Sequence, residues 1–182
     1  MQRFRIGAAL IVLAIAGSVI VGQGTPPVPN AAPASDVVIG SGSFSPIVTD
    51  LERSLKFYTD LVGAAAPATI PAWSSDPALL NFLGAPTSQI RFSSVRIPGS
   101  TLTVEIVEYK DIDRKPLQTR VQDPGTAILQ LNVRDLDGLV KTLKAAGYPT
   151  VSPDGQPVTI GGSTRIAIVR DPNNLFLELI QR

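Results

Sequence analysis

The stretch that decides the fold is Asp171-Pro172-Asn173-Asn174-Leu175-Phe176-Leu177-Glu178-Leu179-Ile180-Gln181. Its first four residues favour a tight turn, because proline fixes φ and asparagine tolerates the left-handed region. The residues that follow predict a strand that is apolar on both faces except at Glu178. A carboxylate in such a strand needs a cation, a proton or hydrogen bonds to compensate its burial. Glu178 is therefore a candidate functional residue.

The composition of the chain limits its chemistry. Its 182 residues include 16 Lys and Arg against 15 Asp and Glu. This balance leaves no basic surplus for a phosphate backbone, so we expect no nucleic-acid partner. The chain has neither cysteine nor histidine. Disulfides, thiolate metal sites, Ser-His-Asp catalysis and His-ligated metals are therefore excluded within it.

The amino terminus has the composition of a targeting segment. Arg3 and Arg5 precede an uncharged, largely apolar run over residues 6–22. Residues 1–22 therefore predict either a cleaved signal peptide or an amino-terminal membrane anchor, and both alternatives stay open. Residues 23–42 are rich in Pro and Ala and predict a spacer. We expect an exported protein of the cell envelope, periplasmic or otherwise extracytoplasmic, that contacts the membrane only through its amino-terminal segment.

Residues 43–182 consist of two copies of one pattern, in units 43–110 and 126–182. Val48-Thr49-Asp50-Leu51 matches Val133-Arg134-Asp135-Leu136, and Val104-Glu105-Ile106-Val107 matches Leu177-Glu178-Leu179-Ile180. Each copy predicts a βαβββ unit from its alternating and helical periodicities. The expected fold class is α+β, with the two tandem units forming a curled mixed sheet around one cavity.

The element boundaries follow from local signals. Alternation predicts a strand over residues 43–48, and Thr49 and Glu52 have the spacing of a capping box that begins a helix. Gly63 is expected to end that helix. The other expected elements are strands at residues 90–97, 101–109, 127–133, 148–151, 164–169 and 175–180, and helices at residues 77–83 and 135–147.

Three segments resemble one protein family. They are IVTDLERSLKFYTDLVG (47–63), NVRDLDGLVKTLKAAG (132–147) and DPNNLFLELIQ (171–181). In this order they are similar to the vicinal oxygen chelate superfamily, which includes glyoxalase I, extradiol dioxygenases, and bleomycin- and fosfomycin-resistance proteins. The resemblance covers residues 43–182. It implies the fold, and it leaves the activity open because this fold carries unrelated functions.

The resemblance also implies four metal-ligand positions on the concave face. In the metal-dependent members, two are usually His on the first strands and two are usually Glu on the last strands. Carried over by spacing, the first pair falls on Ser43 and Ile128, and the second on Glu105 and Glu178. Both carboxylates are present and both imidazoles are missing. We therefore expect no cofactor, and a divalent metal held through oxygen ligands is the less favoured alternative.

Strand parity groups other polar side chains with the two carboxylates, and Arg91 lies on a neighbouring strand. Two alternatives stay open for the carboxylates: they form ion pairs with Arg91 or Arg165 that only close the cavity, or one of them acts as a general base. Trp73, in the irregular loop, either covers the cavity or anchors the loop. The candidate ligand-binding residues are Ser43, Ser45, Arg91, Thr103, Tyr109, Gln130 and Asn132, with Glu105 and Glu178 as catalytic candidates.

Two principal functions are compatible with this reading. The favoured function is a glyoxalase- or bleomycin-resistance-like module that binds a small molecule without a His-ligated metal. The alternative is a lyase, isomerase or dioxygenase-like enzyme that uses Glu105 and Glu178 as metal ligands or as a general base. The resemblance to proteins that bind bleomycin between subunits adds a homodimer as an open possibility. An interaction protein held off the membrane by its spacer is a third reading.

Overall fold

The computed structural model describes residues 40–65 and 69–182. The expected signal or anchor, and most of the expected spacer, lie outside the described residues. Within the described ranges, no helix is long and apolar enough to cross a membrane. Residues 41–182 form one compact unit, and the fold below is that of this unit.

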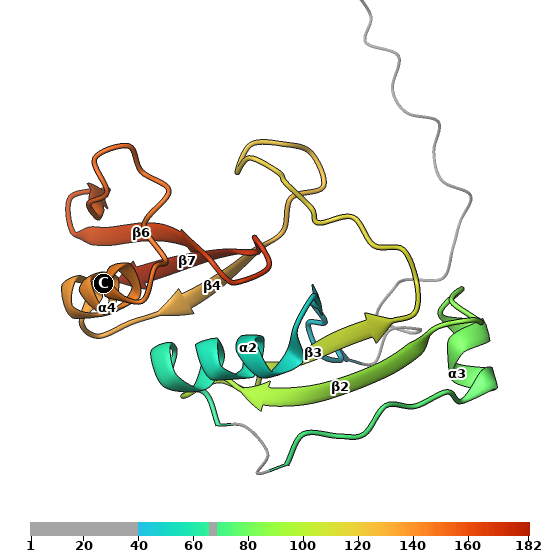
Figure 1. Cartoon of the computed structure of the whole chain (residues 1–182). Coiled ribbons are helices and arrows are strands. Elements are labelled where there is room, and N and C mark those ends of the chain that lie inside the picture. The colour runs from blue at the N-terminus through green and yellow to red at the C-terminus, as the bar shows by residue number, and fades with distance from the viewer. Residues whose placement is uncertain (1–39, 66–68) are drawn as a thin grey trace, which may run out of the picture. The chain divides into compact units, whose positions relative to one another are not determined.

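In the first half the helices and strands come in the predicted order, but one strand is reduced to isolated bridges. Its sheet has the order β1-β3-β2, with β1 parallel and β2 antiparallel to β3. The remaining strand of the unit is represented by isolated bridges from Ala65 to Arg96 and from Ser74 to Ile90. The elements are β1 (Ile47–Val48), α2 (Leu51–Lys56), the π-helical turn η1 (Phe57–Leu61), α3 (Pro77–Phe82), β2 (Gln89–Arg96) and β3 (Thr103–Lys110) (Figure 1).

The second half repeats this topology with four strands in the order β4-β7-β6-β5. Again the first strand is parallel to the last, and the other neighbours are antiparallel. The strand expected at residues 148–151 is wrong: only Thr150 forms a bridge, to Val169, and the edge strand lies at β5. The elements are β4 (Ile128–Asn132), α4 (Leu136–Ala145), β5 (Val158–Ile160), β6 (Thr164–Arg170) and β7 (Phe176–Gln181).

The helix that follows the first strand of each half, α2 or α4, begins at an aspartate. The Asp50 side chain accepts a hydrogen bond from the Arg53 N–H, and Asp135 accepts one from the Gly138 N–H. Such N-caps satisfy backbone donors that have no partner within the helix. The expected capping box at Thr49 is therefore wrong by one residue. Gly63, at φ 75°, follows the end of the first helical segment as expected.

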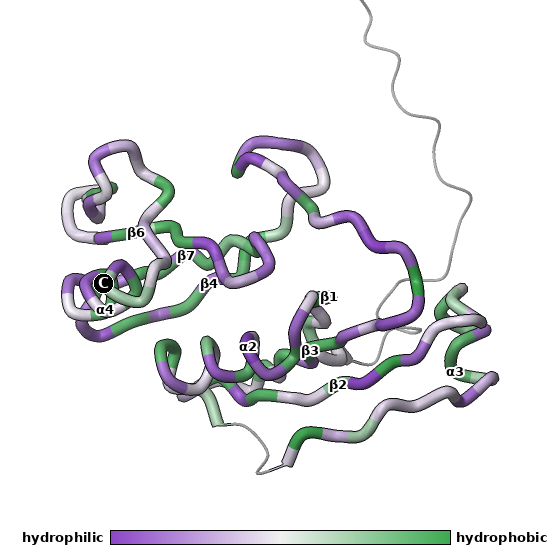
Figure 2. The backbone as a smooth tube through the Cα atoms, viewed as in Figure 1, coloured by the Kyte–Doolittle hydropathy of each residue, from purple (hydrophilic) through white to green (hydrophobic). Residues whose placement is uncertain are grey.

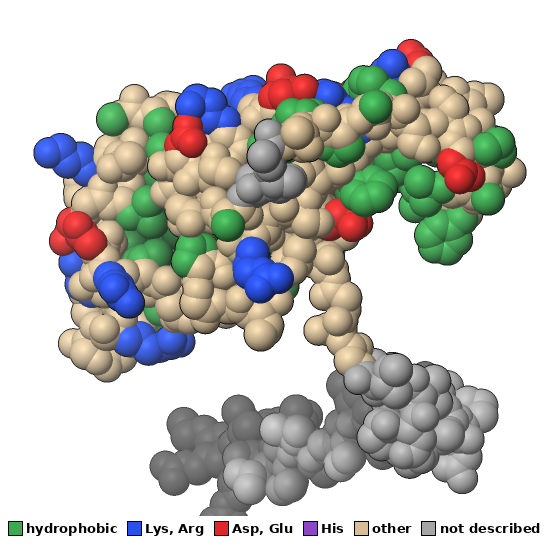
Figure 3. Space-filling model, turned by 90° about the horizontal axis from the view of Figure 1, so that it is seen from below, with side chains coloured by type: hydrophobic (Ala, Val, Ile, Leu, Met, Phe, Trp, Pro, Cys, Tyr) green, Lys and Arg blue, Asp and Glu red, His purple; other side chains and the backbone are tan. Residues whose placement is uncertain are grey.

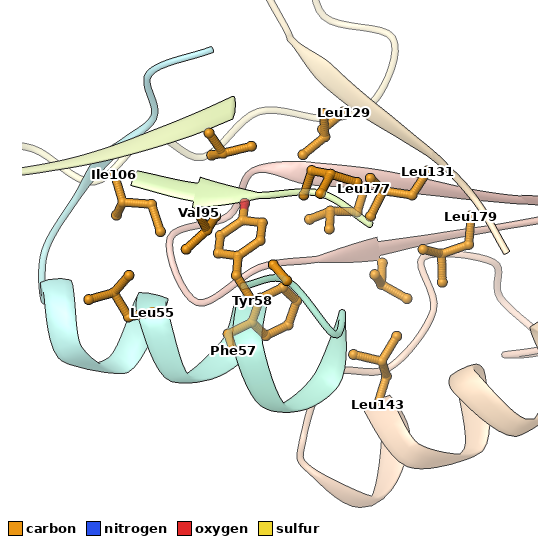
Figure 4. Packing of buried hydrophobic residues seen from close by; sticks show 14 of the residues in the cluster. Leu55, Phe57, Tyr58, Val95, Ile106, Leu129, Leu131, Leu143, Leu177 and Leu179 are labelled. Atoms are coloured by element: carbon orange, nitrogen blue, oxygen red, sulfur yellow. The ribbon is translucent and has the colours of Figure 1, made fainter. Parts of the chain in front are cut away.

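The hydrophobic core joins the two halves. Phe57 and Tyr58 are buried and contact side chains from both sheets within one cluster (Figure 4). Their neighbours include Val95 and Ile106 from the first half and Leu177 from the second, which Figure 4 shows around the two rings. Burial of apolar surface is the main stabilising contribution here, at about 25 cal/mol per Å². The connector between β3 and β4 is mostly hydrophilic and lies outside this core (Figure 2).

The Asp-Pro-Asn-Asn turn fastens the second half to the first. The Asn173 side chain accepts hydrogen bonds from the Thr49 N–H and hydroxyl, at 2.8 and 3.0 Å, and donates to Ser54 Oγ at 2.9 Å. Asp171 Oδ2 accepts from the Tyr58 hydroxyl at 3.4 Å. Asn174 adopts φ 68°, which asparagine tolerates in a tight turn. The opening stretch is thus a turn, as predicted, and also a joint between the halves.

Candidate functional site

The first candidate carboxylate lies on the face of the first sheet that is turned away from α2. On β3, Val104 and Ile106 are fully buried on the α2 side, so Glu105 projects to the opposite face and is only half-buried. There, Ser45 Oγ donates a hydrogen bond to Glu105 Oε1 at 3.4 Å. Ser45 comes from the segment before β1, which is linked to β3 through the Phe44–Val104 bridge.

The second carboxylate has the same surroundings in the second half. Leu177 and Leu179 are fully buried against the helices, and Glu178 between them projects to the opposite face. Gln130 Nε2 donates to Glu178 Oε2 at 2.6 Å, and the two residues are direct partners in the β4–β7 register. Each half therefore places one glutamate beside one polar side chain, from β4 in the second half and from the segment that leads into β1 in the first. We call these two pairs, Ser45–Glu105 and Gln130–Glu178, the carboxylate face.

The carboxylate face is open in the described part of one chain. Ser45, Gln130 and Ile128 are all exposed. Glu105 and Glu178 do not line the three pockets formed at Gly63–Thr101, Arg53–Asn174 and Val151–Ile168, and no hydrogen bond or ion pair joins the two carboxylates within the described residues.

Large apolar side chains surround the carboxylates without being covered. Ile47 is 55% exposed and Phe92 is 45% exposed, and their register with Val107 puts both on the same face as Glu105. Ile128, at 39% exposure, lies on the Glu178 side of the second sheet. Figure 3 views the domain from below Figure 1 and shows hydrophobic side chains gathered toward the end where α3 lies. Apolar area of this kind is typical of a surface that binds something.

The other predicted polar residues are placed around this face with different partners. Asn132 is exposed, and its Oδ1 accepts a hydrogen bond from Arg182 at 2.7 Å. Tyr109 packs against a small buried cluster that contains Leu80 from α3 and Ile90, and burial raises the pKa of its hydroxyl. Thr103 is half-buried and Ser43 is exposed.

Arg91 does not belong to the carboxylate face. It pairs in register with Glu108 on the helix-facing side, where its guanidinium bonds Glu108 Oε2 at 2.8 Å and Glu52 at 2.6 and 2.8 Å. Arg165 likewise pairs with Asp137 of α4 at 2.7 and 2.8 Å. The prediction that these arginines pair with the candidate carboxylates is therefore wrong. The cause is strand parity, since side chains an odd number of residues apart along a strand project to opposite faces.

Trp73 contacts cations rather than the carboxylates. The Arg91 guanidinium lies 4.5 Å from the centre of its ring, and the Lys110 ammonium lies 4.6 Å from it. Contacts of this kind are attractive, by about 0.5–1 kcal/mol each at exposed sites. Trp73 thus holds the irregular loop against the edge of the first sheet, which agrees with the simpler of its two predicted roles.

The donor set of the carboxylate face fits a metal ion poorly. No group of three or more Asp or Glu side chains that could hold a metal ion occurs within residues 40–65 and 69–182. Of the four positions implied by the family resemblance, Ile128 has no donor atom and Ser43 offers only a hydroxyl. Ca²⁺ usually takes six to eight oxygen ligands, several of them carboxylates or carbonyls, whereas Mg²⁺ takes six and keeps several waters beside one or two carboxylates.

Two buried carboxylates were missed by the sequence analysis. Glu108, 8% exposed, accepts the first free N–H of α2, from Leu51, at 3.2 Å. Asp171, 3% exposed, accepts from the backbone N–H groups of Asn173 and Leu175 at 2.7 and 2.9 Å. Burial raises the pKa of the Asp171 carboxyl, although these hydrogen bonds oppose the shift. Burial, with Asp171 beside it, also raises the pKa of the Tyr58 hydroxyl. The alternation of β3 could have predicted that the Glu108 side chain projects to the helix-facing side. The partners of Asp171 are brought together only by the fold, so the sequence gives no signal for them.

Comparison with known proteins agrees with this architecture. The chain is 26% identical over 136 residues to a 2-epi-5-epi-valiolone epimerase of Actinomyces sp., covering 73% of this chain and 74% of that protein. A glyoxalase family protein of Bacillus cereus has a similar fold, with a TM-score of 0.69 at 16% identity over 79% of this chain and 94% of its own. The fosfomycin resistance protein FosX of Listeria monocytogenes has a TM-score of 0.53 at 18% identity, over 80% and 92%.

A family model completes the assignment. The model described as the glyoxalase/bleomycin resistance protein/dioxygenase superfamily matches residues 42–179. This range covers both βαβββ halves except for the end of β7, and it contains both carboxylates of the carboxylate face. The chain therefore belongs to the glyoxalase/bleomycin resistance protein/dioxygenase superfamily, as its three sequence segments indicated.

Proposed function

We propose that the domain binds a small organic molecule on the carboxylate face without a His-ligated metal. The observation that carries this proposal is the repeated pair: Ser45 beside Glu105, and Gln130 beside Glu178. A glutamate accepts hydrogen bonds and attracts cations, while the exposed Phe92 can contact an apolar body. The ligand class is therefore a small molecule with an apolar part and a cationic or hydrogen-bond-donating group.

The metal-free part of the proposal rests on the donor set. Without histidine or cysteine in the chain, a transition-metal site here would have to use oxygen ligands alone, which suit hard cations. Ile128, at one of the implied ligand positions, supplies none. The proposal therefore gives Glu105 and Glu178 direct contact with the ligand rather than with an ion.

A second copy of the chain would close the face. The exposed Ile47, Phe92 and Ile128 leave apolar surface beside the carboxylates, and burying such surface stabilises an association by about 25 cal/mol per Å² before its entropic cost. We therefore propose a homodimer. Sedimentation of the purified protein tests it, with a monomer at every concentration as the contradicting result.

The proposal includes export. The basic residues Arg3 and Arg5 before the apolar run of residues 6–22 support a targeting segment. The mature amino terminus, found by mass spectrometry, separates cleavage from anchoring. A protein recovered intact from the cytosol, with its amino terminus at Met1, would contradict export.

An enzymatic function is the second candidate, favoured by the relative named as an epimerase. In this case Glu105 or Glu178 would act as a general base on a substrate held between the two pairs, within hydrogen-bond reach of the proton it removes. Exchange of a substrate C–H proton with deuterated solvent would be lost in the responsible Glu→Gln variant. A binding module would show no such exchange.

The test of binding uses benzylamine, which joins a cation to an apolar ring, titrated into the labelled protein and followed by NMR. We expect shifts that centre on β3 and β7, and weaker binding in Glu105→Gln and Glu178→Gln. Asp113→Asn, which removes an exposed carboxylate from the connector, is the matched control and should bind normally. Equal binding in all four proteins would contradict a role for the carboxylate face.

A further inference from the structure

The face of the second sheet that carries Glu178 also carries an arginine. Arg170 is opposite Phe176 in the β6–β7 register, and Ile168, two residues before it, is opposite Glu178. Side chains an even number of residues apart along a strand project to the same face. Arg170 therefore lies on the face of Glu178 as its diagonal neighbour across the two strands, a separation that is typically about 7–8 Å.

Neutral contacts hold the Arg170 guanidinium in place. The group lies 4.1 Å from the centre of the Phe176 ring. It donates hydrogen bonds to two backbone carbonyl oxygens, of Thr119 at 2.6 Å and of Asn174 at 3.3 Å. These two bonds use only part of its five N–H donors. The guanidinium is thus oriented, keeps its charge, and has donors left for a ligand.

Arg170 and Glu178 do not neutralise each other. Glu178 accepts its hydrogen bond from the neutral amide of Gln130, at 2.6 Å. Among the residues that the structure describes, no ion pair involves Arg170 or Glu178. Both side chains are half-buried rather than covered. A positive and a negative group are therefore available side by side on one face of the sheet.

Apolar side chains lie beside the two charged groups. Ile168 is half-buried, and Ile128 is 39% exposed. Because Phe176 is only 1% exposed, these two isoleucines supply the apolar surface that a ligand would contact. Two rows of side chains cross the adjacent strands β6, β7 and β4 on this face (Figure 1): Arg170, Phe176 and Ile128 in one, and Ile168, Glu178 and Gln130 in the other.

The first half repeats the placement of the arginine. Arg96 is opposite Thr103, and Ser94 is opposite Glu105, so Arg96 is the diagonal neighbour of Glu105. Arg96 is exposed, whereas Arg170 is fixed by its two carbonyls and the Phe176 ring. A side chain that is already ordered loses less conformational entropy on binding. The arginine of the second half is therefore the better site for an anion.

We propose that the ligand of the carboxylate face is a zwitterion, whose anionic group contacts Arg170 and whose cationic group contacts Glu178. The planar N–H fork of a guanidinium matches the oxygens of a carboxylate or phosphate group. The apolar body between the two charges lies on Ile128 and Ile168. The inference rests on the proposed function, which assigns the ligand a cationic or donating group, and it adds the anionic group.

The experiment compares benzylamine with 4-(aminomethyl)benzoate, which adds one carboxylate across the same ring. Each is titrated into the ¹⁵N-labelled full-length chain, and the Kd is taken from backbone amide shifts in β6 and β7. We expect the zwitterion to bind about tenfold more tightly, the gain expected for one charge-assisted hydrogen bond. Arg170→Gln should remove this advantage, and benzylamine should bind to it slightly more tightly because a like charge is gone. Arg170→Lys should keep part of the advantage.

Arg165→Gln is the matched control. It removes a cation from the same strand on the opposite face, where Arg165 pairs with Asp137 at 2.7 Å, and it should keep the full advantage of the zwitterion. An equal loss in Arg165→Gln would reduce the effect to general charge. A larger loss in Arg96→Gln than in Arg170→Gln would place the anion in the first half and overturn the assignment.

The two ligands separate this inference from the proposed function. Benzylamine that binds as tightly as the zwitterion would overturn the inference alone, and no binding of either compound would contradict both. An advantage that persists in Arg170→Gln would also overturn the inference. If Arg170→Gln does not fold, Arg170→Lys decides, because it keeps a cation beside the Phe176 ring but lacks the planar fork. An undiminished advantage in Arg170→Lys would then be the contradicting result.

Discussion

The two halves of the domain bind the first free backbone N–H of their helix with different acceptors. In both, the last strand supplies an acceptor to the first free N–H of the helix. Leu51 N–H donates to Glu108 at 3.2 Å in the first half, and Leu136 N–H donates to Gln181 at 2.9 Å in the second. Both acceptors are opposite an arginine in the sheet register, Arg91 or Arg165. The topology thus requires an acceptor at this position, and its charge is free to vary.

The difference in charge makes the first half more dependent on its arginine. The Arg91 and Glu108 side chains are 13% and 10% exposed, and their closest atoms are 2.7 Å apart. Arg165 instead pairs with Asp137, whose side chain is 65% exposed. A buried ion pair costs much more to break than an exposed one, because the remaining charge is left without water or a partner.

The largest expected effect comes from breaking the buried pair. Arg91→Met should lower the free energy of unfolding by about 3 kcal/mol, since it leaves the Glu108 carboxylate buried. Arg165→Met, at the equivalent position, should cost less than about 1 kcal/mol, because Asp137 is solvated. Urea denaturation of both variants measures the difference. Equal losses would mean that the halves do not differ in this way.

The joint at Asp171 gives an intermediate effect that depends on pH. Asp171→Ala should cost about 2 kcal/mol, because it leaves two backbone donors and the Tyr58 hydroxyl without an acceptor. The folded pKa of Asp171 is raised by burial, so its stabilising contribution is complete below the ordinary aspartate pKa and is lost as pH rises through the folded value.

Asp171→Asn isolates that dependence. It keeps an acceptor for the Asn173 and Leu175 N–H groups and cannot ionise, so its stability relative to the unaltered chain should increase from acidic to neutral pH. Urea denaturation across this range checks it. A relative stability that falls with pH would show that the ionised form of Asp171 is the favoured one.

The smallest effect is expected when the two acceptors are exchanged. Glu108→Gln keeps an acceptor for the Leu51 N–H and leaves Arg91 paired with Glu52, so the cost should be about 1 kcal/mol. Gln181→Glu places a carboxylate opposite Arg165 and should change stability by no more than about this amount. Thermal unfolding of each variant measures the exchange. A loss well above this in Gln181→Glu would show that the second half requires a neutral acceptor.

Much of this fold could be predicted from the sequence, because periodicity decides the faces of long elements. Alternation around Glu105 and Glu178 placed both carboxylates on the faces opposite α2 and α4, where the structure has them. The edge strand was missed because its three residues are too few to give a periodic signal in the sequence. Asp50 replaced Thr49 as the N-cap since the Thr49 N–H and hydroxyl bond to Asn173, a residue 124 positions away. Contacts between residues so far apart in the chain cannot be predicted from local sequence patterns.

The sequence predicted the residues of the candidate site better than it predicted their interaction partners. The sequence predicted the two glutamates, and it grouped Ser45 and Gln130 with them, but it also counted Arg91 among their neighbours. The parity of β2 excludes this, because Arg91 shares the helix-facing side with the fully buried Val95. The openness of the face has no local signal, because it depends on how the two sheets are arranged.

Metal analysis of the purified full-length chain, alone and as Glu178→Gln, tests the central claim most directly. The claim is that Glu105 and Glu178 contact a ligand rather than a metal ion. After dialysis, the account predicts less than one equivalent of Mn, Fe, Ni or Zn in either protein, and the same amount in both. A stoichiometric metal that survives dialysis and disappears in Glu178→Gln would contradict it, and would make the carboxylate face a metal site.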